Sequence, residues 1–132
     1  MLCLLHWKEE SQHAILDELE WRRVHARSTA SERDQGVTDL IELVGAVDQL
    51  VQVQARADAE YFISCGGPMY GSAEQQAIHD TLLRAYRWQY IVSGAQDPRF
   101  GEVLAELVTP AQMERIGAAL GPIVAHVAQA AH

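Results

Sequence analysis

Apolar residues recur every three or four positions along almost all of this 132-residue chain, and no segment alternates with period two for long enough to form a strand. That spacing lines up apolar side chains on one side of an α-helix. The stretch with Leu40, Leu43, Val44, Val47 and Leu50 is a clear example. The sequence therefore predicts an all-α protein, and its length fits a single domain over residues 1–132.

A polar segment, residues 28–36, interrupts this pattern after the first predicted helix, which begins near Leu2 and ends between Ala26 and Ala30. Thr38 is a residue type that caps helix N-termini, so the second helix is expected to begin there and to end near Ser64. The end is expected at Gly66-Gly67-Pro68, because glycine tolerates a positive φ and proline cannot continue the helical hydrogen bonds.

Three later helix starts carry capping signals. Ser72 to Gln75 has the pattern of a capping box. Asp97-Pro98 and Thr109-Pro110 each place proline at the first helical position after an N-cap residue. The three helices are expected to end near Gly94, Leu107 and Ala130. Three long and two shorter helices predict an antiparallel bundle.

Charge and hydropathy exclude several classes of partner. The formal net charge is −8 and no stripe of lysine and arginine exists, so no nucleic-acid partner is expected. No apolar run approaches the roughly 18 residues that span a membrane, and the first residues do not resemble a signal peptide. The expected location is therefore the cytoplasm. The two cysteines, Cys3 and Cys65, are expected to be reduced and buried.

Glu10 and His13 form a Glu-x-x-His pair in the first predicted helix. Residues three apart share one helix face, so the carboxylate and the imidazole can converge on one point. That pair of ligand types suits iron, manganese or zinc. The face that carries them also holds Trp7, Trp21 and Val24, so it is expected to point inward.

Glu60 and His79 are the other candidate ligands. Glu60 continues an apolar stripe of the second helix, and His79 lies near the start of the third. With a helix start at Thr38, counting from the turns brings both residues level with Glu10 and His13. The sequence thus predicts one interior cluster of the four. The alternatives are an ion pair of Glu60 with Arg56 or Arg84, and a histidine at position 79 packed in the core.

Lys-Glu-Glu-Ser-Gln-His-Ala at residues 8–14 resembles the Glu-Glu-x-x-His-Ala signature of ferritin-like di-iron carboxylate proteins, such as rubrerythrins and bacterioferritins. Ala59-Glu60-Tyr61 is similar to their third-helix glutamate, and His79 to their second motif histidine. The resemblance covers about residues 1–93. It implies a ferritin-like bundle, with additional short C-terminal helices, in which Glu10 and His13 hold one iron ion, Glu60 bridges or caps, and His79 holds the second. It also implies redox or oxidase chemistry on iron, dioxygen or peroxide.

Two features depart from that family. Gln76 stands where the second Glu-x-x-His motif has glutamate, and the family's glutamate-bearing first helix has no counterpart in this chain. The chain is therefore either a piece of a longer protein or completed by a second subunit, and a homo-oligomer is expected. Two alternatives stay open: a metal-free bundle that serves as an oligomerisation or interaction module, and a single zinc or manganese ion bound by His13, His79 and one carboxylate. Enzymatic activity is left open.

Overall fold

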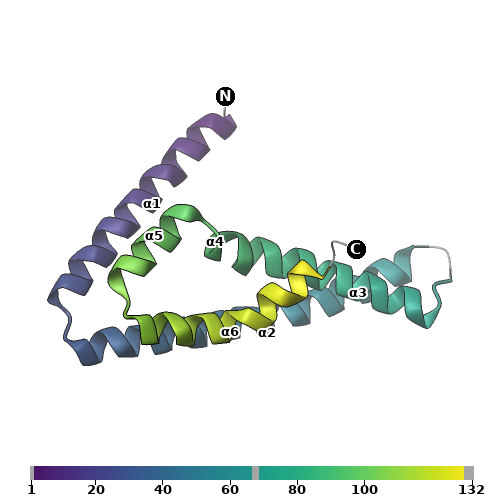
Figure 1. Ribbon diagram of the computed structural model, residues 1–132. Helices are drawn as coiled ribbons and strands as arrows, with labels where there is room; N and C mark the ends of the chain where they lie inside the picture. The colour runs from purple at the N-terminus through teal and green to yellow at the C-terminus, as the bar shows by residue number, and fades with distance from the viewer. Residues whose placement is uncertain (1, 67–68, 130–132) are drawn as a thin grey trace.

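The computed structural model describes the backbone of residues 2–66 and 69–129 and the side chains of residues 12–66 and 69–129 (Figure 1). Every regular element in these ranges is helical, which confirms the all-α prediction. The elements are α1 (Leu2–Arg27), α2 (Ala30–Cys65), α3 (Ser72–Arg87), the π-helical turn η1 (Trp88–Val92), α4 (Ser93–Ala95), α5 (Pro98–Leu107) and α6 (Pro110–Ala128). None of the described helices is long and apolar enough to cross a membrane.

The link between α1 and α2 consists of Ser28 and Thr29, so the predicted break over residues 28–36 and the helix start at Thr38 are wrong. Thr29 is the N-cap of α2. Its backbone N–H donates to the Glu32 carboxylate at 2.7 Å, and the N–H of Glu32 donates to Oγ1 of Thr29 at 3.3 Å. This capping box satisfies two donors of the first turn. Residues 31–36 are polar because they form an exposed helical surface, with Arg33 partly buried.

The remaining helix ends follow the sequence closely. Asp97 and Thr109 cap α5 and α6 as predicted, each accepting a hydrogen bond from the backbone N–H three residues later. The N-cap of α3 is Gly71 rather than Ser72, and its N–H donates to the carboxylate of Glu74 at 2.7 Å. The second helix ends at Cys65, but Gly66 has a φ of −75° and not the expected positive value. The predicted end of the last helix at Ala130 lies outside the described residues.

The body of the molecule is an antiparallel pair of helices, α2 and α3, which η1 extends and α6 covers (Figure 1). Three small apolar clusters hold it together. They are centred on Val37 with Leu104 and Ile116, on Val51 with Ala55 and Leu83, and on Ile91 with Val92 and Ile123. These residues recur at helical spacing, so each helix buries one stripe against its neighbours.

Helix α1 does not join this body along its length. From the short link, α1 and α2 diverge like the arms of a V, and α1 contacts α5 (Figure 1). Trp21 stacks on Phe100 with ring centroids 6.0 Å apart. Toward the N-terminus, Ile15, Leu16 and Leu19 are exposed, so no described part of the chain covers this apolar face of α1.

Candidate functional site

Glu60 of α2 and His79 of α3 line the same surface depression, together with Arg56, Gln75 and Gln76. The antiparallel hairpin brings the two residues level, as counting from the intervening turn predicts. Glu60 is exposed, and the His79 side chain is 26% exposed. The pair therefore lies at the surface and not in the expected interior.

The polar partners around His79 are local. Its Nδ1 lies 3.3 Å from Oδ1 of Asp80, and the amide of Gln76 donates to the same oxygen at 2.8 Å. Gln76, which stands at the family's glutamate position, is thus engaged with Asp80. Within the described residues Glu60 forms no ion pair, so the alternative pairing with Arg56 or Arg84 is not observed.

Glu10 and His13 lie on the outer half of α1. The Glu10 side chain is outside the described side chains, and His13 is exposed. Because the link falls at Ser28 and Thr29, Glu10 is about 19 residues before the α2 N-cap and Glu60 about 31 after it. The difference of about 12 residues corresponds to about 18 Å along a helix axis. The predicted height match used a helix start at Thr38 and fails with the observed one.

The expected interior cluster of Glu10, His13, Glu60 and His79 is not seen in the described side chains, because His13 and Glu60 are exposed and His79 is half-buried. Among the residues that the structure describes, no three His, Cys, Asp or Glu side chains lie close enough to hold a metal ion. Their assignment as iron, manganese or zinc ligands stays a prediction. Cys65 is a free thiol and exposed, not buried as expected, and the side chain of Cys3 lies outside the described side chains.

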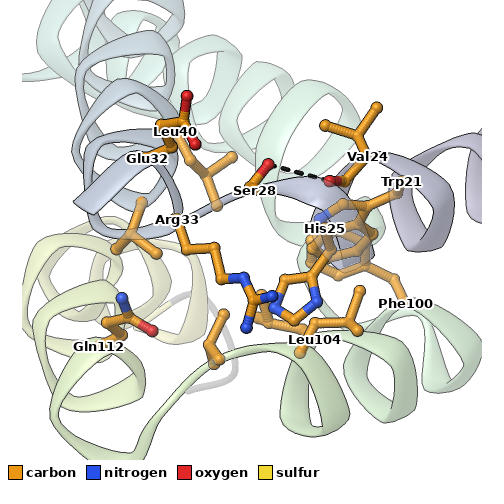
Figure 2. A pocket seen from close by; sticks show the side chains of 14 residues that line it. Trp21, Val24, His25, Ser28, Glu32, Arg33, Leu40, Phe100, Leu104 and Gln112 are labelled. Atoms are coloured by element: carbon orange, nitrogen blue, oxygen red, sulfur yellow. Dashed lines mark hydrogen bonds between the residues drawn. The ribbon is translucent and has the colours of Figure 1, made fainter. Parts of the chain in front are cut away.

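A second site, which the sequence did not predict, occupies the inner corner where α1, α2 and α5 meet (Figure 2). We call it the corner cavity. Its volume is about 400 Å³, and its walls are mainly apolar. Arg33 of α2 and His25 of α1 point toward each other in it. Nothing in the sequence distinguishes Arg33 from the polar residues around it, because only the fold of α1 over α5 encloses it.

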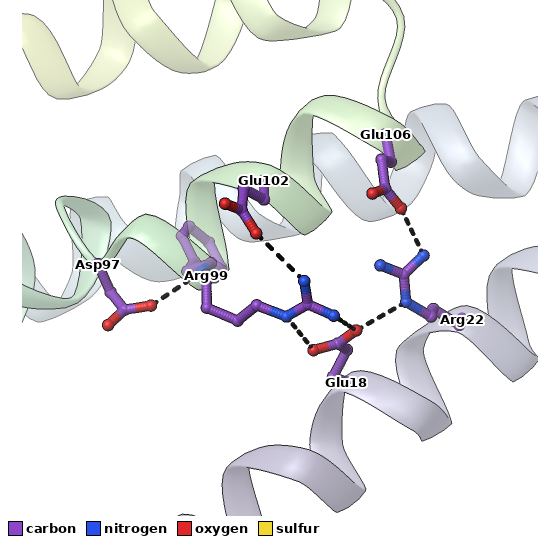
Figure 3. A network of polar contacts seen from close by, with 7 residues as sticks. Glu18, Arg22, Asp97, Arg99, Glu102 and Glu106 are labelled. Atoms are coloured by element: carbon purple, nitrogen blue, oxygen red, sulfur yellow. Dashed lines mark hydrogen bonds and ion pairs between the residues drawn. The ribbon is translucent and has the colours of Figure 1, made fainter.

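Ion pairs fasten α1 to α5 beside this cavity (Figure 3). Arg99 donates through Nε to Glu18 at 2.7 Å, and Arg22 donates to Glu18 at 2.9 Å and to Glu106 at 2.6 Å. The hydrogen bond from Arg99, followed by that from Arg22, lowers the pKa of Glu18 below its ordinary value of 4.5. Glu18 is thus held as a carboxylate between two guanidinium groups.

Comparison with known proteins assigns no function to these sites. No family model, no curated protein and no solved structure matches the chain. The ferritin-like resemblance accordingly stays a prediction that rests on Glu10, His13, Glu60 and His79.

Proposed function

We infer that the chain functions as a homo-oligomeric helical protein in which α1 of one copy covers an exposed apolar stripe on α2 of another. The stripe, called here the α2 stripe, comprises Leu43, Ala46, Leu50, Val53 and Ala57. These residues follow helical spacing and are all exposed, with Leu50 and Val53 each 69% accessible. A continuous exposed apolar surface of this kind is typical of a protein interface.

The α1 helix of a second copy supplies a matching surface. If it lies antiparallel on α2 with its Glu10 level with Glu60, each step forward on α1 is a step back on α2. Leu16 is then level with Gln54, next to Val53 of the stripe. Leu19 is likewise level with Val51, next to Leu50. The same register therefore brings the two apolar faces to the same height, which supports an isologous dimer.

Metal binding of the ferritin-like kind is the second candidate function. It is favoured by the position of Glu60 at the end of the α2 stripe and by the depression that Glu60 shares with His79. If α1 of a second copy turned its Glu10 and His13 face, opposite to Leu19, toward this depression, the donors would be two carboxylates and two imidazoles. That set fits iron and also manganese or zinc. Bound iron would supply one-electron redox chemistry, while the four side chains would hold and orient it.

The assembly is tested by light scattering at micromolar protein concentration. The wild type is expected to be a dimer or larger, and Leu50→Asp with Val53→Asp to be a monomer, because two charges would be buried in the interface. Ala118→Asp, on an exposed position of α6, is the matched control and should keep the wild-type mass. A monomeric wild type would refute the assembly.

The metal candidate is tested separately by elemental analysis of protein purified after growth with iron. Glu10→Ala and Glu60→Ala should each lower the metal content without loss of helix. Gln76→Glu should raise it, because a carboxylate replaces a neutral amide. Equal metal content in all four proteins would reject this candidate and leave the metal-free oligomerisation module.

A further inference from the structure

We propose that the corner cavity binds a small amphipathic carboxylate, with Arg33 as the partner of the anionic group. The cavity lies where the two arms of the V meet and is distinct from the depression of Glu60 and His79 (Figure 2). Its volume of about 400 Å³ is in the range of small-molecule sites. The inference is independent of the proposed assembly.

The guanidinium of Arg33 has no anionic partner among the described residues, so it is available to a ligand. Its Nε is buried without a hydrogen-bond partner, and its guanidinium forms no ion pair among the described residues. By contrast, Arg22, Arg87, Arg99 and Arg115 each pair with a carboxylate. A buried donor without a partner is costly, and the planar guanidinium matches a carboxylate in shape and charge.

The polar neighbours of Arg33 are already engaged. The Glu32 carboxylate accepts from both the N–H and the hydroxyl of Thr29. Gln112 accepts from the N–H of Thr109 and donates to Asp34. Glu32, the acidic residue of the cavity wall, forms no ion pair with Arg33 among the described residues. The imidazole of His25, which lies beside the guanidinium, offers one further N–H to an incoming anion.

The apolar walls of the corner cavity favour a ligand whose carboxylate is attached to an apolar group. They are formed chiefly by Trp21, Leu40, Phe100, Leu104 and Val108. An apolar chain or ring attached to the carboxylate would cover this surface and displace water from it. A bare anion such as acetate would leave the walls in contact with water. The expected class is therefore a monocarboxylic acid with an apolar body, of the medium-chain fatty-acid type.

Calorimetric titration with octanoate, 1-octanol and acetate tests both halves of this argument. The wild-type protein should bind octanoate about tenfold more tightly than either of the other compounds, because only octanoate meets both the guanidinium and the apolar walls. Arg33→Gln should weaken octanoate binding about tenfold and abolish the preference over octanol. Arg56→Gln, an exposed position on the same helix, is the control and should bind as the wild type.

Gly36→Leu provides a second test that keeps Arg33 intact. Gly36 lines the cavity, and a Cβ built on it meets nothing within 4 Å. The added side chain should narrow the cavity and lower octanoate affinity while the far-UV circular dichroism stays helical. The proposal is overturned if octanoate and octanol bind equally, if octanoate gives no heat at millimolar concentration, or if both variants bind like the wild type.

Discussion

Asp48 and Arg87 join α2 to the end of α3 through a bidentate ion pair. The guanidinium of Arg87 donates through Nε to Oδ1 of Asp48 at 2.7 Å and through Nη2 to Oδ2 at 2.9 Å. Each side chain is only 14% exposed. A bidentate pair so far removed from water is worth more than an exposed one, and losing either member leaves the other charge unpaired.

Asp48→Asn is expected to lower the free energy of unfolding by about 1.5–3 kcal/mol, because Arg87 would lose its anionic partner. Urea denaturation followed by circular dichroism measures the change. Asp39→Asn is the control, since Asp39 is exposed on the same helix and accepts a hydrogen bond from Gln35 four residues before it. Equal effects of the two substitutions would contradict the special role of Asp48.

His126, near the end of α6, is a second residue whose surroundings change its protonation. Burial first, and then the charges of Arg87 and Arg84, lower its pKa below the ordinary value of 6.5, while Asp80 and Asp48 act in the opposite direction. Its Nδ1 is buried and finds no hydrogen-bond partner in the described part of the chain. The folded protein therefore favours the neutral imidazole.

This shift predicts a loss of stability in mild acid. Because the folded-state pKa is lowered, the unfolded chain binds the proton first as pH falls. The stabilising contribution is fully present above pH 6.5 and is lost as pH falls through the lowered pKa. Urea midpoints at pH 8 and pH 5 should differ less for His126→Leu than for the wild type. An unchanged difference would exclude His126 as a source of the pH dependence.

At the scale of elements, two kinds of contact fasten α1 to the body. In the ion pairs of Glu18, Arg22 and Arg99, the Arg99 side chain is exposed and the other two are half-buried, so the pairs remain open to solvent; such pairs contribute little and are screened by salt. The stacking of Trp21 on Phe100 buries apolar surface and does not depend on salt. The aromatic contact is therefore expected to hold the arm in place.

Phe100→Ala should release α1 without unfolding the rest of the chain. Amide hydrogen exchange should become faster in residues 12–27 and stay unchanged around Ala55 and Leu83, which lie in a separate cluster. Met69→Ala is a suitable control because Met69 is fully exposed. Faster exchange throughout the chain would show that α1 and the body unfold together.

Helix α2 contains a glycine that its structure does not need. A Cβ on Gly45 would meet nothing within 4 Å, whereas a Cβ on Gly66 would lie 3.1 Å from the carbonyl oxygen of Phe62. Gly45→Ala should therefore stabilise the protein by about 0.5–1 kcal/mol, through reduced backbone entropy of the unfolded chain. Thermal unfolding measures this change in stability. Gly66→Ala should not stabilise the protein, because its Cβ would crowd the Phe62 carbonyl oxygen. A lower melting temperature for Gly45→Ala would contradict the geometry.

At the scale of the whole molecule, the structure is an open V with its core in only one arm. Three small clusters stabilise the body of α2, α3 and α6. No described residue of α1 is fully buried. Apolar surface on the outer half of α1 and on the α2 stripe thus remains in contact with water in the isolated chain, and covering it is the basis of the proposed assembly.

Mass action offers a thermodynamic check of that assembly. If folded chains associate, the melting temperature should rise with protein concentration, because association stabilises the folded state. The rise should disappear in the variant with Leu50→Asp and Val53→Asp, whose interface is charged. A melting temperature of the wild type that does not change over a hundredfold range of concentration would argue against association.

Local interactions explain what the sequence by itself determined. The helical class and the caps at Asp97 and Thr109 depend on residues within four positions of one another, so they could be predicted and were confirmed. The capping box of Thr29 and Glu32 is equally local, but the polar run that follows it fits a loop as well as an exposed helical surface. The start of α2 at Ala30 rather than at Thr38 changes the height of Glu60 relative to Glu10.

Tertiary structure decided the rest. Trp21 and Phe100 are far apart in the sequence, so their stacking, which joins α1 to α5, has no local signal. The helical spacing of apolar residues identifies the α2 stripe as an apolar face. It does not tell whether another helix packs on that face, because this depends on the tertiary structure. For the same reason no local signal marks Arg33, which lies in an apolar cavity formed by α1, α2 and α5 and has no ion-pair partner among the described residues.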